Sequence, residues 1–140
     1  MLVLYKRVAK QVQRIMKDTE KTVNGHTLGE CTKSILPVRD ALEVVNGKWK
    51  LPIIVSLMFG NKRFSQIARE VPGITDKMLS KELRDLECNE LVKRKVYDSI
   101  PVVVEYSLTE YGHSLKVVIE VLREWGMKHR ERMMGEAVAV

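Results

Sequence analysis

The sequence has few of the side chains that build metal sites and disulfide frameworks. Its 140 residues include two cysteines, Cys31 and Cys88, in no CxxC pair, and three histidines without HExxH or HxxxH spacing. A disulfide scaffold needs several paired cysteines, and a zinc site needs clustered cysteine or histidine ligands. We therefore expect no metal and no cofactor.

Long hydrophobic runs are also absent. No stretch of about 18 apolar residues could span a membrane, and charges interrupt the N-terminal segment too early for a signal peptide. We expect a cytoplasmic protein without membrane contact.

The chain shows no recognisable catalytic constellation. It contains no Gly-rich phosphate loop, no paired carboxylates in a plausible pocket and no nucleophile beside a base. We predict that the protein is not an enzyme.

The composition is that of a folded domain. Apolar residues make up 45% and charged residues 30% of the chain, a balance atypical of disordered sequences. The formal net charge is +6, and the positive excess lies in the first 70 residues. This charge is compatible with a polyanionic partner, although many surfaces are merely basic.

Two terminal segments flank the predicted core. Residues 1–34 should form an amphipathic helix and then a loop from Thr22 to Ser34, because Asn24-Gly25 and Gly29 punctuate that stretch. Residues 35–109 should form the core, and residues 110–140 a C-terminal helix and tail.

Four further helices are expected in turn, the last two joined by a Gly-containing turn. Pro37 should begin the first, and Pro52 should mark a late start or a bend in the second, Lys48–Met58. Ser65 is a plausible N-cap of the third, and Thr75 of the fourth, residues 75–88. This order is the helix-turn-helix pattern.

Beyond Asn89 the apolar period changes from about 3.6 to 2, which predicts a β-hairpin over residues 92–108. Thr109 can then cap a long final helix. The expected fold is mainly α with a small β-hairpin wing, a winged helix-turn-helix.

The terminal helices carry apolar stripes too long for this core to cover. Exposed stripes of that size usually mark interfaces, so we expect a homodimer. The expected dimer-interface residues are Tyr5, Val8, Val12, Ile15, Leu115, Val118, Ile119, Leu122 and Trp125.

The outer face of helix 75–88 is the main candidate DNA-binding surface. Lys77, Ser80, Lys81 and Arg84, which we call the recognition face, recur at helical spacing. In a major groove, Arg84 or a lysine can bond guanine O6 and N7, and Ser80 can reach a base edge or phosphate. The alternative is a solvated polar face, favoured by four nearby carboxylates: Asp76, Glu82, Asp85 and Glu87.

Additional polar residues are candidates for phosphate or wing contacts. They are Lys62, Arg63, Ser65, Gln66, Lys93, Arg94 and Lys95. Such residues fix position on the duplex without reading its sequence. Plain helix capping and a solvent-facing charge run are the competing interpretations.

Several pieces of the chain together resemble the HxlR-type winged helix-turn-helix family, over about residues 35–126. The resemblance implies a prokaryotic transcriptional regulator that binds double-stranded DNA as a homodimer through its terminal helices. The matching pieces are Pro37–Leu42, Gly47-Lys48-Trp49, Arg63-Phe64, Pro72-Gly73-Ile74, Leu79-Ser80, Leu83–Glu87 and Val104–Thr109.

The chain departs from the family pattern at two positions. Leu36 stands where many members have a cysteine, which in some of them senses electrophiles or oxidants. Cys31, in the predicted loop beside Lys33, is then a candidate redox sensor or an ordinary thiol, and Cys88 is expected to be a packed apolar residue.

The second departure lies in the wing, where Val103 replaces an arginine. The wing therefore lacks one candidate phosphate or minor-groove contact. Tyr106 is expected to bury its ring on the apolar face of the hairpin.

Two functions follow. The first is a dimeric, sequence-specific transcriptional regulator that reads a pseudo-palindromic operator with helix 75–88 in the major groove. The alternative is a winged-helix protein-interaction module with little or no specific DNA binding.

Overall fold

The computed structural model describes Lys10 and residues 28–135. Contacts divide the chain into two compact units, whose described parts are residues 28–113 and, separately, Lys10 with residues 114–135. The predicted N-terminal helix, with Tyr5, Val8, Val12 and Ile15, lies outside the described residues except for Lys10. The predicted domain boundaries stay predictions. No helix within the described ranges is both long and apolar enough to cross a membrane.

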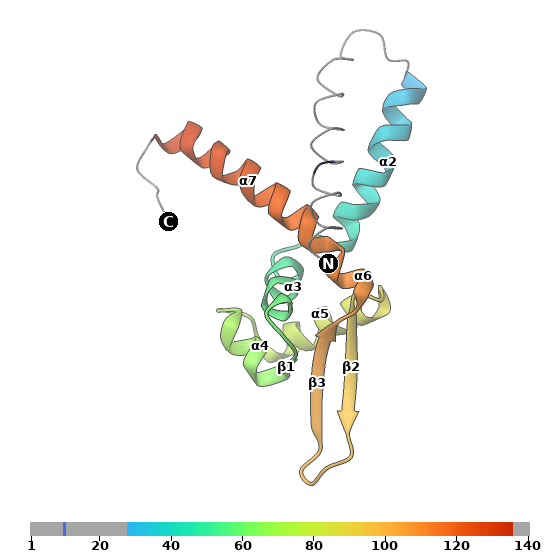
Figure 1. Ribbon diagram of the computed structural model, residues 1–140, viewed down its shortest axis with the longest axis vertical. Coiled ribbons are helices and arrows are strands. Elements are labelled where there is room, and N and C mark those ends of the chain that lie inside the picture. The colour runs from blue at the N-terminus through green and yellow to red at the C-terminus, as the bar shows by residue number, and fades with distance from the viewer. Residues whose placement is uncertain (1–9, 11–27, 136–140) are drawn as a thin grey trace. The chain divides into compact units, whose positions relative to one another are not determined.

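The described part of the first unit combines helices with three strands (Figure 1). In chain order they are α2 (Leu28–Val44), α3 (Lys50–Met58), β1 (Lys62–Arg63), α4 (Phe64–Glu70), α5 (Asp76–Cys88), β2 (Val92–Tyr97), β3 (Val103–Leu108) and α6 (Glu110–His113). The second unit contains α7 (Leu115–Met134). The predicted class, mainly helical with a small antiparallel sheet, is confirmed.

The core of the first unit forms where apolar helix stripes meet. Full burial of one such side chain contributes about 1.5–3 kcal/mol. Its buried apolar residues are Ile53, Ile54 and Leu57 of α3, Ile67 of α4, Leu79, Leu83 and Leu86 of α5, Val71, Leu91, Val92 and Leu108. Helix α3 begins at Lys50, later than the predicted Lys48, and Pro52 lies in its first turn.

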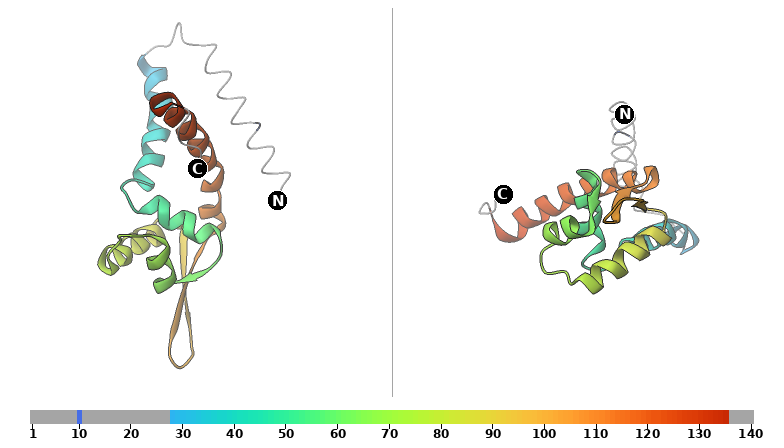
Figure 2. Two further views of the ribbon diagram at one scale, coloured as in Figure 1. Left: turned by 90° about the vertical axis from the view of Figure 1, so that its left-hand side faces the viewer. Right: turned by 90° about the horizontal axis from the view of Figure 1, so that it is seen from below.

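The sheet has three antiparallel strands in the order β1-β3-β2. β2 and β3 form the predicted hairpin, with Val92 opposite Leu108 and Tyr97 opposite Val103. This hairpin projects beyond α4 and α5 (Figures 1 and 2). β1, in which Lys62 pairs with Tyr106, was not predicted.

A close contact fixes the base of the hairpin. The Thr109 hydroxyl donates to the Glu90 carbonyl oxygen at 2.6 Å and accepts from the Gly112 N–H at 2.9 Å. A Cβ at position 112 would collide with the Leu91 carbonyl oxygen and crowd Leu108. Glycine at this position therefore lets α6 lie against the turn between α5 and β2.

The loop prediction is wrong for residues 28–34, because α2 begins at Leu28. The prediction that Pro37 begins this helix is also wrong, because Pro37 lies in its interior. A single glycine such as Gly29 costs a helix only about 1 kcal/mol. Glu30 in the first turn also complements the helix dipole. Cys31 is consequently a helical residue.

Two of the three predicted caps need correction. Ser65 is not an N-cap, because α4 already begins at Phe64, and the Arg63 N–H donates instead to Gln66 Oε1 at 2.8 Å. Thr109 caps the short helix α6, and α7 begins only at Leu115. Thr75 caps α5 as predicted, since its Oγ1 accepts from the Met78 N–H at 3.2 Å.

Candidate nucleic-acid interface

Helix α5 presents the predicted recognition face to solvent. Its opposite side buries Leu79, Leu83 and Leu86 in the core, and this burial fixes the rotation of the helix about its axis. On the outer side, Lys77, Lys81 and Arg84 are exposed and Ser80 is half-buried. The structure therefore brings the four residues onto the accessible side of one helix.

Arg94 of β2 extends the recognition face toward the wing. Together with Ser80 and Arg84 it lines an open hollow of about 350 Å³, completed by Glu87 and Tyr106. The hollow between α5 and the hairpin is thus lined by two guanidinium groups, two hydroxyls and one carboxylate. Tyr106 is half-buried and lines this hollow, and the packing of its ring on the apolar face of the hairpin stays a prediction.

The remaining wing cations lie on the other face of the hairpin, because neighbouring residues of a strand point to opposite faces. Lys93 and Lys95 alternate with Arg94, and Lys95 pairs with Glu105 across the sheet. The Lys95 ammonium lies 4.7 Å from the centroid of the Tyr97 ring. The predicted cluster of residues 93–95 is thus divided between two faces, with all three side chains exposed.

Lys62 stands apart from the other predicted phosphate contacts. Its ammonium forms an ion pair with Glu70 and donates to the Ser56 carbonyl oxygen at 2.6 Å, and its side chain is only 12% exposed. Hydrogen bonds from Lys62, and then from Ser56, lower the pKa of Glu70. Lys62 therefore ties β1 to α3 and α4.

The other residues predicted around α4 are accessible. Arg63, Ser65 and Gln66 are exposed at the junction of β1 and α4. The side chain of Gln66 is engaged by the Arg63 N–H, as described for the cap.

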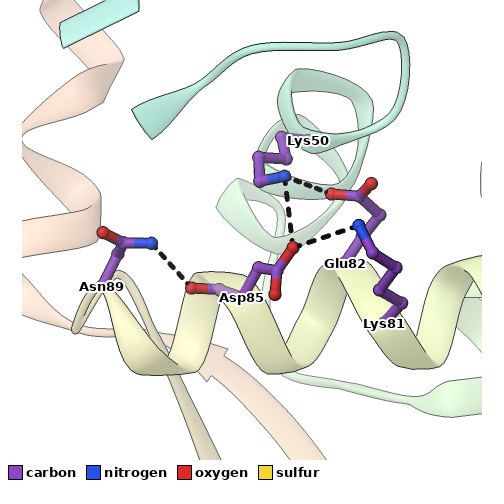
Figure 3. Close-up of polar contacts among 5 residues, drawn as sticks. All are labelled: Lys50, Lys81, Glu82, Asp85 and Asn89. Atoms are coloured by element: carbon purple, nitrogen blue, oxygen red, sulfur yellow. Dashed lines mark hydrogen bonds and ion pairs between the residues drawn. The ribbon is translucent and has the colours of Figure 1, made fainter. Parts of the chain in front are cut away.

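A charge network missed by the sequence reasoning connects α5 to α3 (Figure 3). Lys50 Nζ lies 2.6 Å from Glu82 Oε2, with the two side chains 9% and 10% exposed. Asp85 Oδ2 lies 3.6 Å from Lys50 Nζ and 3.5 Å from Lys81 Nζ. The Asn89 side chain donates to the Asp85 carbonyl oxygen at 2.9 Å and closes the last turn of α5.

Burial of Glu82 had a recognisable signal in the sequence. The residue lies three positions after Leu79 and four before Leu86, within the apolar stripe. Glu82 is buried and therefore does not support the alternative interpretation of a solvated polar face.

Both cysteines are free and exposed. The expectation that Cys88 is packed is wrong, because the residue ends α5 on its solvent side. Cys31 lines an open apolar hollow on α2 with Ile35 and Val38, and its sensing role stays a prediction. Within the described ranges, no cluster of His, Cys, Asp and Glu side chains is suited to a metal ion.

The predicted dimer residues of α7 are accessible. Val118, Leu122 and Trp125 are 49%, 50% and 60% exposed, and Leu115 and Ile119 are half-buried. The Trp125 ring is stacked on His129, with centroids 5.0 Å apart. Their role in dimerisation stays a prediction.

Comparisons with known proteins identify a family for the chain. The profile of a family described as HxlR-like helix-turn-helix matches residues 44–134. An uncharacterised HTH-type transcriptional regulator of Bacillus subtilis (strain 168), YtcD, is 42% identical over 111 residues, which cover 79% of this chain and 88% of that protein.

Solved structures are similar as well. The crystal structure of a putative HTH-type transcriptional regulator, ytcD, has a TM-score of 0.64 and 46% identity, over 66% of this chain and 94% of that one. The redox regulator HypR in its reduced form has a TM-score of 0.66 and 41% identity, over 69% of this chain and 96% of that one.

Proposed function

The chain belongs to the HxlR-like helix-turn-helix family of transcriptional regulators, and from this premise we propose that it binds double-stranded DNA with α5 in the major groove. The observation that carries the proposal is the recognition face itself. Three exposed cations and a hydroxyl occupy the side of α5 opposite its buried leucines, next to Arg94. The relatives compared above are regulators, not enzymes.

Within this proposal, different residues read and hold the DNA. Arg84 and Ser80 contact base edges, and Lys77 and Lys81 contact base edges or phosphates on either side. Arg94 follows the backbone beside the groove. Its place in the hollow with Ser80 and Arg84 supports that role.

Phosphate contacts come from exposed residues around the groove. Arg63, Ser65 and Gln66 reach the backbone from the start of α4, and Lys93 and Lys95 reach it from the outer face of the wing. Lys62 is left out of this set because its ammonium is committed to Glu70 and Ser56.

The regulator acts as a homodimer in this proposal. Accessible apolar residues on α7, above all Trp125 and Leu122, support an interface with a second copy. A twofold dimer places two α5 helices in successive major grooves, about 10 base pairs apart. The operator is then pseudo-palindromic.

Selection from a random pool of duplexes tests this function. Rounds of capture by the purified protein are expected to enrich two inverted half-sites separated by about one helical turn. The pool selected with Arg84→Ala should show a relaxed base preference at the position that Arg84 contacts. A pool without any common sequence after repeated rounds would contradict specific reading.

A further inference from the structure

Asp85 of α5 lies between two ammonium groups (Figure 3). Its Oδ2 is 3.6 Å from Lys50 Nζ and 3.5 Å from Lys81 Nζ. Both separations exceed the usual length of an N–H···O hydrogen bond, so the attraction is mainly electrostatic. The Asp85 side chain is 42% exposed, which leaves it within reach of the charge field of a bound duplex.

The two ammonium groups differ in freedom. Lys50 is held by Glu82 at 2.6 Å, and both side chains are about one-tenth exposed. The Lys81 side chain is 65% exposed and interacts with Asp85 as an i,i+4 pair. Exposed pairs of this kind contribute only about 0.3–0.5 kcal/mol. Lys81 can therefore leave Asp85 for another anion, whereas Lys50 stays.

We propose that Asp85 limits the strength of DNA binding, because it competes with DNA phosphates for the Lys81 ammonium and so weakens binding to random DNA and to an operator by similar factors. This role rests on the proposed function, in which α5 faces DNA. Non-specific binding consists almost entirely of phosphate attraction, so a lost cation weakens it directly. Operator binding loses the same phosphate attraction, and its base contacts do not replace it.

Lys50 makes this exchange possible. When Lys81 moves to a phosphate, Asp85 keeps the Lys50 ammonium 3.6 Å away, so no carboxylate is left without a counter-charge beside the DNA. The network thus keeps the Asp85 carboxylate beside a cation on the helix that faces DNA in the proposed function.

The test compares Asp85→Asn with Glu43→Gln. Both variants gain one unit of positive charge, but Glu43 is an exposed residue of α2 outside the network. Anisotropy titrations measure affinity for a random duplex and for the selected operator over a series of salt concentrations. Thermal unfolding of each variant checks that α5 remains folded, as expected because Lys50 and Glu82 are unchanged.

The expected result is specific to Asp85→Asn. At low salt it binds the random and operator duplexes about two- to fivefold more tightly, and this gain shrinks as salt screens the charges. The ratio of operator to random affinity stays near the wild-type value. Glu43→Gln leaves both affinities near wild-type values.

The same substitution in a Lys81→Met protein distinguishes a local effect on Lys81 from a general effect of the added charge. In Lys81→Met protein, Asp85→Asn should lose most of its effect, because the two residues then no longer interact. Persistence of the full effect, or equal behaviour of Asp85→Asn and Glu43→Gln, would overturn the role of Asp85 alone. Wild-type protein without salt-dependent DNA binding would overturn the proposed function as well.

Discussion

Arg84 and Lys95 are both exposed cations, yet their positions predict different losses on truncation. Arg84→Ala should cost about 1–3 kcal/mol at the operator and relax base preference, because the guanidinium reads a base edge. Lys95→Ala should weaken operator and random DNA by equal factors, because Lys95 holds phosphate from the outer face of the hairpin.

Titration of both variants against the operator and single-base variants of it measures the difference. Equal losses for the two variants on every duplex would refute these separate roles.

Lys50 supports stability through its buried pair with Glu82. Lys50→Met should lower the free energy of unfolding by about 3–5 kcal/mol, because the Glu82 carboxylate then stays buried without its partner. The exposed residue Lys77 is the control on α5, and Lys77→Met should change stability by less than about 0.5 kcal/mol.

Urea unfolding followed by circular dichroism gives these values. The double variant Lys50→Met, Glu82→Leu should recover much of the loss, since no buried charge remains. A Lys50→Met protein as stable as the wild type would show that the Lys50–Glu82 pair is dispensable.

At the residue scale, sequence patterns predicted which side chains face solvent. They were less successful in predicting which charged side chains form pairs. The recognition face follows from the spacing of Leu79, Leu83 and Leu86, which fixes the opposite side of α5. The partner of Glu82 could not be predicted in this way. Lys50 lies 32 positions away and meets it only when α3 packs on α5.

Among the elements, the wing depends on the close approach at Gly112. Gly112→Ala should destabilise the protein by about 1–3 kcal/mol, because its Cβ would collide with the Leu91 carbonyl oxygen. Gly126→Ala on α7 is the matched control. Its added methyl meets nothing within 4 Å, and alanine favours a helix by up to about 1 kcal/mol over glycine.

Thermal unfolding of both variants checks this prediction. A Gly112→Ala protein as stable as the Gly126→Ala protein would mean that the junction of α6 with Leu91 tolerates extra volume.

Element types were predictable where a periodic pattern was long. Helix α5 and the hairpin follow from clear periods of about 3.6 and 2. β1 was missed because two residues carry no period, and Lys62-Arg63 become a strand only by pairing with β3. The start of α2 was missed because Gly29 and Pro37 weaken a helical pattern without preventing the helix.

For the whole molecule, the proposed dimer predicts a twofold assembly that depends on α7. Sedimentation equilibrium should give the mass of two chains for the wild type. Trp125→Asp should shift the protein toward one chain, because it places a charge within the apolar surface of α7. Lys128→Asp, at an exposed polar position of the same helix, should leave the dimer intact. A dimer equally stable in both variants would mean that the interface lies outside the apolar surface of α7.

Sequence-specific DNA binding is the central claim, and fluorescence anisotropy tests it most directly. Purified protein is titrated against the duplex upstream of its own gene and a scrambled duplex, each at about 50 and 200 mM salt. We predict tight binding that prefers the upstream duplex and weakens by orders of magnitude at the higher salt. Equal and weak binding to both duplexes would contradict the claim and favour a winged-helix module that binds protein partners.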